Sequence, residues 1–224
     1  MQTLQTLRTN LQQRLRGASR IALLGIGSEL RADDVAGILI AQRVQELAGK
    51  SEIRISKSET NRNDQNSKSQ TEAELAPRFD PSDFGFVSDF GRDARPVQLA
   101  IFLGGTAPEN LTGEIKRFHP THLVIVDAAD LDSEPGAITI MDPDSIGGTT
   151  FCTHSLPIKV MIDYLLESFE RDPKRDPSRL GTQCHVTVIG VQPQSLEVGV
   201  PVSKEVLDAV ESLSALLLET LPRP

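Results

Sequence analysis

Acidic residues and one histidine follow separate apolar runs of the chain. Asp33 and Asp34 come after an apolar run that ends at Ile26, Asp127 ends a second run, and His154 lies in a later loop. In open α/β sheets, ligands bind beyond the carboxyl ends of the strands. We therefore expect two carboxylates, one from Asp33 or Asp34 and one from Asp127 or the nearby Asp130, to converge there with the imidazole of His154. Their oxygen and nitrogen atoms suit a divalent first-row metal such as nickel or zinc.

Each of these residues also has an ordinary structural interpretation. An acidic residue at the start of a helix commonly caps it, which is the interpretation we favour for Asp33 and keep open for Asp34. Asp127 could bind backbone amides of the next turn, and a histidine in a polar loop is often a surface residue. The remaining histidines, at positions 119, 122 and 185, are weaker candidates. The conjunction of three loops, rather than any one residue, favours a site.

The elements that must position these side chains alternate along the chain. Short apolar runs predict buried strands, and apolar spacings of three and four predict amphipathic helices. The expected strands cover 21–26, 97–103, 122–127, 137–141 and 185–189; the expected helices cover 4–15, 35–47, 109–118, 157–169 and 206–217. This alternation predicts a single three-layer α/β/α domain with a mainly parallel sheet.

Two segments are additions to that domain. Residues 1–17 predict an N-terminal amphipathic helix, and residues 18–49 with 97–224 form the α/β domain. Residues 50–96 are an insertion, whose polar part, 50–74, is too poor in apolar residues to offset its ordering entropy and is predicted to be disordered. Four of the eight phenylalanines lie in 79–90. We expect this stretch to dock onto the domain or onto a partner.

Composition and motifs exclude several function classes. The 224 residues carry a formal charge of −8 and no basic stripe, which argues against nucleic acid. No apolar run approaches the roughly 20 residues of a membrane helix, so a cytoplasmic protein with two reduced cysteines is expected. Gly25 and Gly27 follow a strand, but Leu30 replaces the third glycine of the dinucleotide fingerprint. A P-loop and a nucleophile elbow are also missing, and Cys152 is interpreted as a structural thiol.

Five segments, in this order and spacing, resemble a known family. They are Gly25–Gly37 (GIGSELRADDVAG), Gly104–Asn110 (GGTAPEN), Leu123–Ala128 (LVIVDA), Thr153–Pro157 (THSLP) and Gly190–Pro193 (GVQP). The chain is similar to the nickel-iron hydrogenase maturation endopeptidases, most closely to the HycI type that processes the large subunit of hydrogenase 3. The resemblance covers about residues 20–48 and 99–218.

The resemblance implies a cytoplasmic aspartyl-type protease, expected to be a monomer. Its implied partner is the hydrogenase large-subunit precursor, from which it removes a C-terminal extension after nickel insertion. Asp34, Asp127 and His154 match the family's metal-binding and catalytic positions, and the nickel they recognise is implied to be carried by the substrate. Two mechanisms stay open: the metal activates the carbonyl or a water, or it only positions the substrate while a carboxylate such as Asp33 or Asp34 activates water.

One departure from the family pattern supports an alternative. Family members often have Asp-Gly-Gly where this chain has Leu103-Gly104-Gly105. The insertion could supply a replacement carboxylate, such as Asp83 or Asp89. Without one, a non-catalytic factor that binds the nickel-loaded large subunit is the alternative function. A generic zinc hydrolase is a third, and it would require tightly bound zinc.

Overall fold

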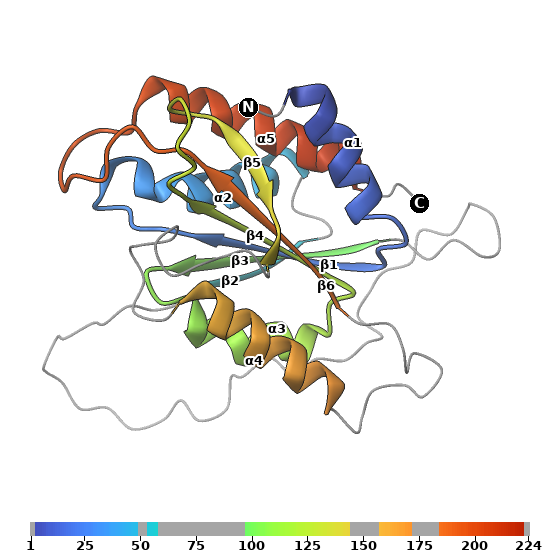
Figure 1. Cartoon of the computed structure of the whole chain (residues 1–224). Coiled ribbons are helices and arrows are strands. Elements are labelled where there is room, and N and C mark those ends of the chain that lie inside the picture. The colour runs from blue at the N-terminus through green and yellow to red at the C-terminus, as the bar shows by residue number, and fades with distance from the viewer. Residues whose placement is uncertain (1–2, 49–52, 58–96, 144–156, 172–183, 222–224) are drawn as a thin grey trace, which may run out of the picture.

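A six-stranded sheet forms the centre of the molecule (Figure 1). The computed structural model describes residues 3–48, 53–57, 97–143, 157–171 and 184–221. The strand order is β2-β3-β1-β4-β6-β5, and only β5 is antiparallel to its neighbour. The strands are β1 (Arg20–Ile26), β2 (Ile53–Lys57), β3 (Gln98–Gly105), β4 (His122–Ala128), β5 (Ile138–Met141) and β6 (His185–Val191). The predicted α/β class with a mainly parallel sheet is confirmed.

Helices cover both faces of the sheet, as parallel sheets require. One face carries α1 (Leu4–Arg14), α2 (Ala36–Ala48) and α5 (Lys204–Thr220). The other carries α3 (Thr112–Phe118) and α4 (Ile158–Glu170). Short 3-10 turns, η1 (Ala32–Val35) and η2 (Pro108–Leu111), precede α2 and α3. Among the described helices, none is long and apolar enough to cross a membrane.

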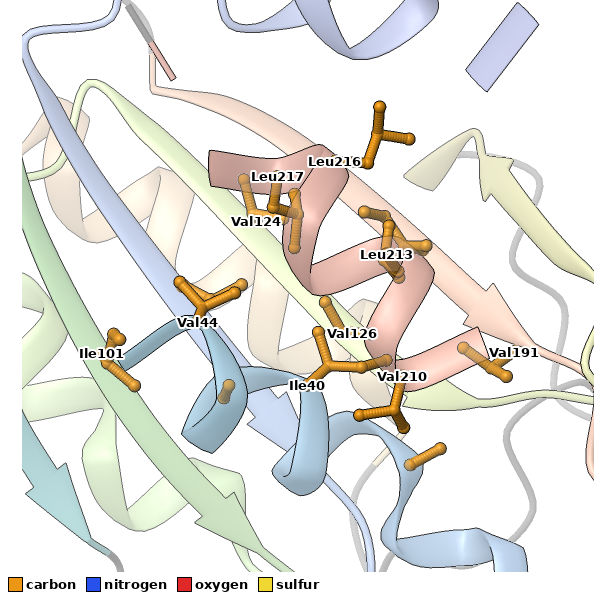
Figure 2. Close-up of a cluster of buried hydrophobic side chains, with 14 of the residues drawn as sticks. Ile40, Val44, Ile101, Val124, Val126, Val191, Val210, Leu213, Leu216 and Leu217 are labelled. Carbon is orange, nitrogen blue, oxygen red and sulfur yellow. The ribbon is translucent and has the colours of Figure 1, made fainter. Parts of the chain in front are cut away.

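Each face of the sheet has its own apolar core. Figure 2 shows part of the first, where Ile40 and Val44 of α2 meet Leu213 and Leu217 of α5 over the strand residue Val124. The second core packs the apolar face of α4 against the opposite side of the strands. The central strand β4 is buried at every position. Its continuous apolar pattern therefore arises because helices cover it on both faces.

The N-terminal helix belongs to the first core. Leu7, Leu11 and Leu15 are buried there together with α5 residues, whereas Leu4 is exposed. Thr3 caps α1, since its hydroxyl accepts a hydrogen bond from the amide of Thr6 at 3.2 Å. The predicted amphipathic helix is thus confirmed, and it packs on the α/β domain.

The prediction of disorder throughout residues 50–74 is wrong for Ile53–Lys57. These residues form β2, which pairs in parallel with β3, in a register that joins Ile53 to Leu99 and Lys57 to Leu103. Isoleucines at 53 and 55 favour a strand. The hydrogen bonds to β3 pair the backbone N–H and C=O groups of this segment, and its polar composition gives no indication of that pairing. Residues 58–96, including Asp83, Asp89 and the phenylalanine stretch 79–90, lie outside the described residues.

Candidate active site at the carboxyl edge of the sheet

The candidate site lies where neighbouring strands continue toward opposite faces of the sheet. From β1 the chain continues into η1 and α2 on one face, and from the adjacent β3 into η2 and α3 on the other. The amide of Gly27 donates a hydrogen bond to the carbonyl of Gly105 at 3.1 Å, which holds the two departing loops together. Such a switch point is where open α/β sheets bind ligands.

Close backbone packing brings η1 over the ends of β1 and β4. A Cβ atom added at Gly27 would lie 1.8 Å from the carbonyl oxygen of Asp34, and one added at Gly37 would lie 2.1 Å from that of Val126. Gly27 also has a φ of +143°, which side chains rarely allow. Gly37 therefore provides the close helix-to-strand packing that the third glycine of a dinucleotide fingerprint would provide.

This packing places Asp34 and Asp127 at the same edge of the sheet. Asp34 lies in η1, which contacts β4, and Asp127 is the next-to-last residue of β4. Both side chains are fully buried. One carboxylate oxygen of Asp127, Oδ1, accepts a hydrogen bond from the amide of Ala128 at 2.8 Å, as the ordinary structural interpretation expects. The edge thus holds two buried carboxyl groups on adjoining elements.

Asp33 has a different role from its neighbour. Its carboxylate accepts hydrogen bonds from the amides of Gln194 (2.7 Å), Ser195 (3.1 Å) and Ser203 (2.7 Å), and from the hydroxyl of Ser203 (2.9 Å). Ser203 in turn caps α5. Asp33 therefore has a structural role, as expected, but it does not cap its own helix. Its carboxylate instead binds the 192–203 loop and the start of α5. With four donors bound, Asp33 is a poor candidate for a general base.

Gln192 is a residue whose role the sequence analysis did not identify. Its Oε1 accepts a hydrogen bond from the amide of Leu131 at 2.6 Å, and its Nε2 donates to the carbonyl of Pro193 at 3.2 Å. It therefore joins the loop after β4 to the loop after β6. The only feature of the sequence that pointed to Gln192 was its position in the GVQP segment.

An acidic hollow borders Gln192. Its volume is about 560 Å³, and it is lined by Asp130, Asp132, Ser133, Glu134 and Gln192. Asp130 is exposed, and its Oδ1 accepts a weak hydrogen bond from the amide of Asp132 at 3.3 Å. This is the geometry of a turn, so Asp130 is a surface carboxylate beside the site rather than a member of the buried pair.

Leu103 occupies the position where the family often has a carboxylate. Its side chain is buried in the core that α2 and α5 share. An apolar residue therefore contributes packing at this position. Among the described residues, Asp34 and Asp127 are the fully buried carboxyl groups of this edge besides Asp33.

His154 lies outside the described residues, as does Cys152. The predicted ligand set of Asp34, Asp127 and His154 therefore stays a prediction. Within the described ranges, no group of three or more histidine, cysteine, aspartate or glutamate side chains is arranged to hold a metal ion. The other cysteine, Cys184, is buried in the second core.

Two of the weaker histidine candidates meet at the opposite edge of the sheet. His122 and His185 begin β4 and β6, and their ring centroids are 5.0 Å apart. Burial, together with the charge of His185, lowers the pKa of His122 to about 4. Both rings are thus separated from the carboxyl edge by the length of the strands.

Comparison with known proteins identifies the family. The HycI model of hydrogenase maturation proteases matches residues 87–220, more than half of the chain. The chain belongs to the HycI family of hydrogenase maturation proteases. As a member of this family it is an endopeptidase. The match runs from before β3 to the end of α5, so β1 and η1, with Asp34, lie before it.

Relatives extend the similarity over the whole HycI fold. A putative hydrogenase maturation protease from Methanocaldococcus jannaschii is 23% identical over 211 residues, which are 94% of each protein. The hydrogenase 3 maturation protease of Escherichia coli is 35% identical over 111 residues, 49% of this chain and 62% of that protein. The crystal structure of a HycI protease from Thermococcus kodakarensis covers 95% of this chain, and this chain covers 98% of it, at 24% identity and a TM-score of 0.63. At this identity the last comparison supports the fold alone.

Proposed function

We propose that this endopeptidase removes the C-terminal extension of a nickel-iron hydrogenase large-subunit precursor after nickel insertion. Membership in the HycI family supports the reaction class. The observation that carries the site is the placement of two fully buried carboxyl groups, Asp34 and Asp127, on adjoining elements at the carboxyl edge of the sheet. Its proposed place of action is the cytoplasm.

The precursor's nickel is the proposed recognition element. Carboxylate oxygens of Asp34 and Asp127, with an imidazole nitrogen of His154, are donors that suit Ni²⁺. Nickel is in this proposal part of the substrate, so the protease needs no resident metal. A precursor without nickel would then lack the group that these side chains bind.

Either Asp33 or Asp34 could, from the sequence, be the carboxylate that activates the attacking water. Because Asp33 is bound to four donors, the proposed base is Asp34. Asp34 would take a proton from the attacking water as the water oxygen bonds to the scissile carbonyl carbon. When the carbon–nitrogen bond breaks, a proton passes to the leaving amine. The products are the mature large subunit and the free C-terminal peptide.

Substitution of the proposed ligands tests this function. We expect Asp34→Asn and His154→Ala each to abolish release of the C-terminal peptide from nickel-loaded precursor, measured by mass spectrometry, while circular dichroism stays unchanged. Glu170→Gln, which alters an exposed carboxylate at the end of α4, is the control and should process normally. Undiminished cleavage by the Asp34 or His154 variant would contradict the assigned roles.

Two further measurements separate the alternatives. Nickel-loaded and nickel-free precursor should differ strongly in cleavage, and equal rates would contradict nickel recognition. Leu103, an apolar residue where the family often has a carboxylate, is the observation behind the alternative of a non-catalytic binding factor. That factor would bind loaded precursor without releasing peptide. Tightly bound zinc in the purified protein, measured by elemental analysis, would instead favour a zinc hydrolase.

A further inference from the structure

Several large apolar side chains are exposed to solvent on the loops beside the candidate site. Leu30 is 74% exposed and Val198 is 73% exposed, the two highest values for large apolar residues among those described. Val200 is also exposed. We call Leu30, Val198 and Val200 the apolar shelf. Isolated apolar residues are common on surfaces, but neighbouring ones at an active-site edge mark binding surfaces more often.

The two loops that form the apolar shelf are bound to each other. The amide of Gly199 donates to the carbonyl of Leu30 at 3.1 Å, and the Arg31 Nε donates to the carbonyl of Leu196 at 3.2 Å. The amide of Asp33 donates to the carbonyl of Ser195 at 3.1 Å. Figure 1 shows the corresponding loops side by side at the ends of the strands.

Polar contacts help to hold the shelf in place. The carboxylate of Asp33 is fully buried and binds donors at both ends of the 194–203 segment. A long loop without helix or strand, fixed in this way with apolar side chains facing solvent, is typical of a functional loop. Its prior ordering lowers the entropic cost of binding another chain.

The shelf adjoins the proposed catalytic carboxylate. Leu30 belongs to the same loop that leads from β1 to Asp34. A polypeptide lying on the shelf would therefore contact the loop that leads to Asp34. This continuity indicates the substrate of the site, rather than an unrelated protein, as the occupant.

The surroundings of the shelf are acidic. Glu29 and Glu197 are exposed and directly precede Leu30 and Val198. The acidic hollow of Asp130, Asp132 and Glu134 borders the same loop through Gln192. Within 28–31 and 192–203 the only basic residue is Arg31, whose Nε is bound to a backbone carbonyl. An apolar segment flanked by basic residues is the complementary partner.

We propose that the apolar shelf binds an extended segment of the precursor next to the scissile bond, through a large apolar side chain flanked by basic residues. This inference rests on the proposed function, because it assigns part of the substrate to a defined surface. The shelf then supplies affinity and register, while Asp34 and Asp127 act on the bond.

Binding measurements test the shelf apart from catalysis. In an Asp34→Asn background, which prevents turnover, we expect Leu30→Ser/Val198→Ser to weaken binding of nickel-loaded precursor at least about tenfold, since each buried apolar side chain contributes substantially to affinity. Leu4→Ser/Leu47→Ser, which alters exposed leucines of α1 and α2, is the matched control and should change affinity less than about twofold. Circular dichroism checks that both double variants are folded.

A charge variant tests the acidic flank. Glu29→Gln/Glu197→Gln should weaken binding at low salt and reduce its salt dependence. An unchanged salt dependence would contradict the basic flank of the proposed segment. Equal affinity of the shelf variant and the control would overturn the shelf as a substrate surface.

The outcomes distinguish the shelf from the function. If otherwise wild-type protein does not cleave loaded precursor, the proposed function fails. If it cleaves, and Leu30→Ser/Val198→Ser cleaves and binds equally well, only the shelf proposal fails. A second copy of this chain is the other possible occupant of the shelf, and sedimentation of the two double variants tests for it. If the shelf variant loses self-association while its binding of precursor stays intact, the shelf binds a second copy and the inference is overturned.

Discussion

Asp33 and Asp34 are adjacent, equally buried and chemically identical, yet the fold uses them differently. The carboxylate of Asp33 receives its hydrogen bonds from residues at least 161 positions away in the sequence. Asp34 lies in the turn that contacts the end of β4, beside Asp127. In a 3-10 turn, successive side chains point in different directions, so neighbouring carboxylates can face different surroundings. Position along the chain therefore says little about which of the two is the reactive group.

Substituting Asp33 should cost stability. In Asp33→Ala, the four donors lose their acceptor, and buried unsatisfied donors are expensive. We expect the free energy of unfolding to fall by about 3 kcal/mol, measured by urea denaturation. Asp130→Ala, at an exposed turn, should change it by less than about 0.5 kcal/mol. Equal effects of the two substitutions would contradict the structural role of Asp33.

His122 should make stability depend on pH at the opposite edge of the sheet. Burial, with the charge of His185, lowers its pKa from 6.5 to about 4, despite the opposing effect of the Arg14 carbonyl. Between these values the unfolded chain binds a proton that the folded chain does not. The free energy of unfolding therefore rises with pH across this window, and the contribution is complete above about pH 6.5 and lost below about pH 4.

The size of this effect is at most about 3.5 kcal/mol, since the two pKa values, 6.5 and about 4, differ by about 2.5 and one pKa unit corresponds to about 1.4 kcal/mol. Urea denaturation from pH 4 to 7 should show a steeper rise for the wild type than for His122→Gln. The other titrating groups are common to both proteins, so the difference between the two curves reports His122 together with its interaction with His185. Parallel curves would contradict the assigned pKa.

Among the elements, the contact between α2 and the strands leaves no room for an added Cβ atom. A Cβ atom at Gly37 would lie 2.1 Å from the Val126 carbonyl oxygen and 2.4 Å from that of Ile26. One at Gly25 would lie 2.3 Å from the Gly37 carbonyl oxygen. Backbone thus packs directly on backbone. This close approach sets the height of η1 above the strands and thereby the place of Asp34.

Gly37→Ala should separate α2 from the sheet. We expect the free energy of unfolding to fall by about 3 kcal/mol, because backbone on both sides cannot move aside. Gly113→Ala in α3 is the matched control, since nothing lies within 4 Å of its added Cβ. Alanine there should raise stability by about 0.5 kcal/mol through helix propensity. Chemical denaturation of both variants measures the contrast, and a neutral Gly37→Ala would rule out the tight contact.

At the scale of the whole molecule, the N-terminal helix is part of the domain's core. Leu7, Leu11 and Leu15 are buried with residues of α5, and Arg8 forms an exposed ion pair with Glu219 at 2.6 Å. The ion pair contributes little, because exposed pairs are worth about 0–1 kcal/mol. Apolar burial therefore attaches α1, and we expect α1 to unfold together with the sheet.

Leucine truncations in α1 test this cooperativity. Leu11→Ala should lower the free energy of unfolding by about 3 kcal/mol, within the range for buried leucines, and Leu4→Ala by less than about 0.5 kcal/mol. The single tyrosine, Tyr164, lies in α4 on the other face of the sheet. Its fluorescence and the far-UV circular dichroism should therefore shift together in Leu11→Ala. A shift in the dichroism alone would show that α1 melts separately.

The local pattern of the sequence was sufficient for the order of helices and strands, the parallel sheet and the position of Asp127 at a strand end. These features depend on hydrophobic periodicity within a few residues. Strand β2 was missed because its stability depends on the ladder to β3, whose paired residues lie 46 positions further along the chain. The polar composition of the residues around β2 does not indicate that β3 is its partner strand.

The chain's sequence by itself determined which residues could form strands, helices and an acidic carboxyl edge. Only the tertiary structure decided that Asp33 anchors the 192–203 loop, that Gly37 replaces a fingerprint glycine in packing, and that Leu30 lies beside Val198. Each of these depends on groups brought together from distant parts of the chain, by hydrogen bonds or backbone contacts that leave no periodic trace in the sequence. Periodicity reports burial of side chains, whereas the roles of individual polar groups depend on the partners that folding provides.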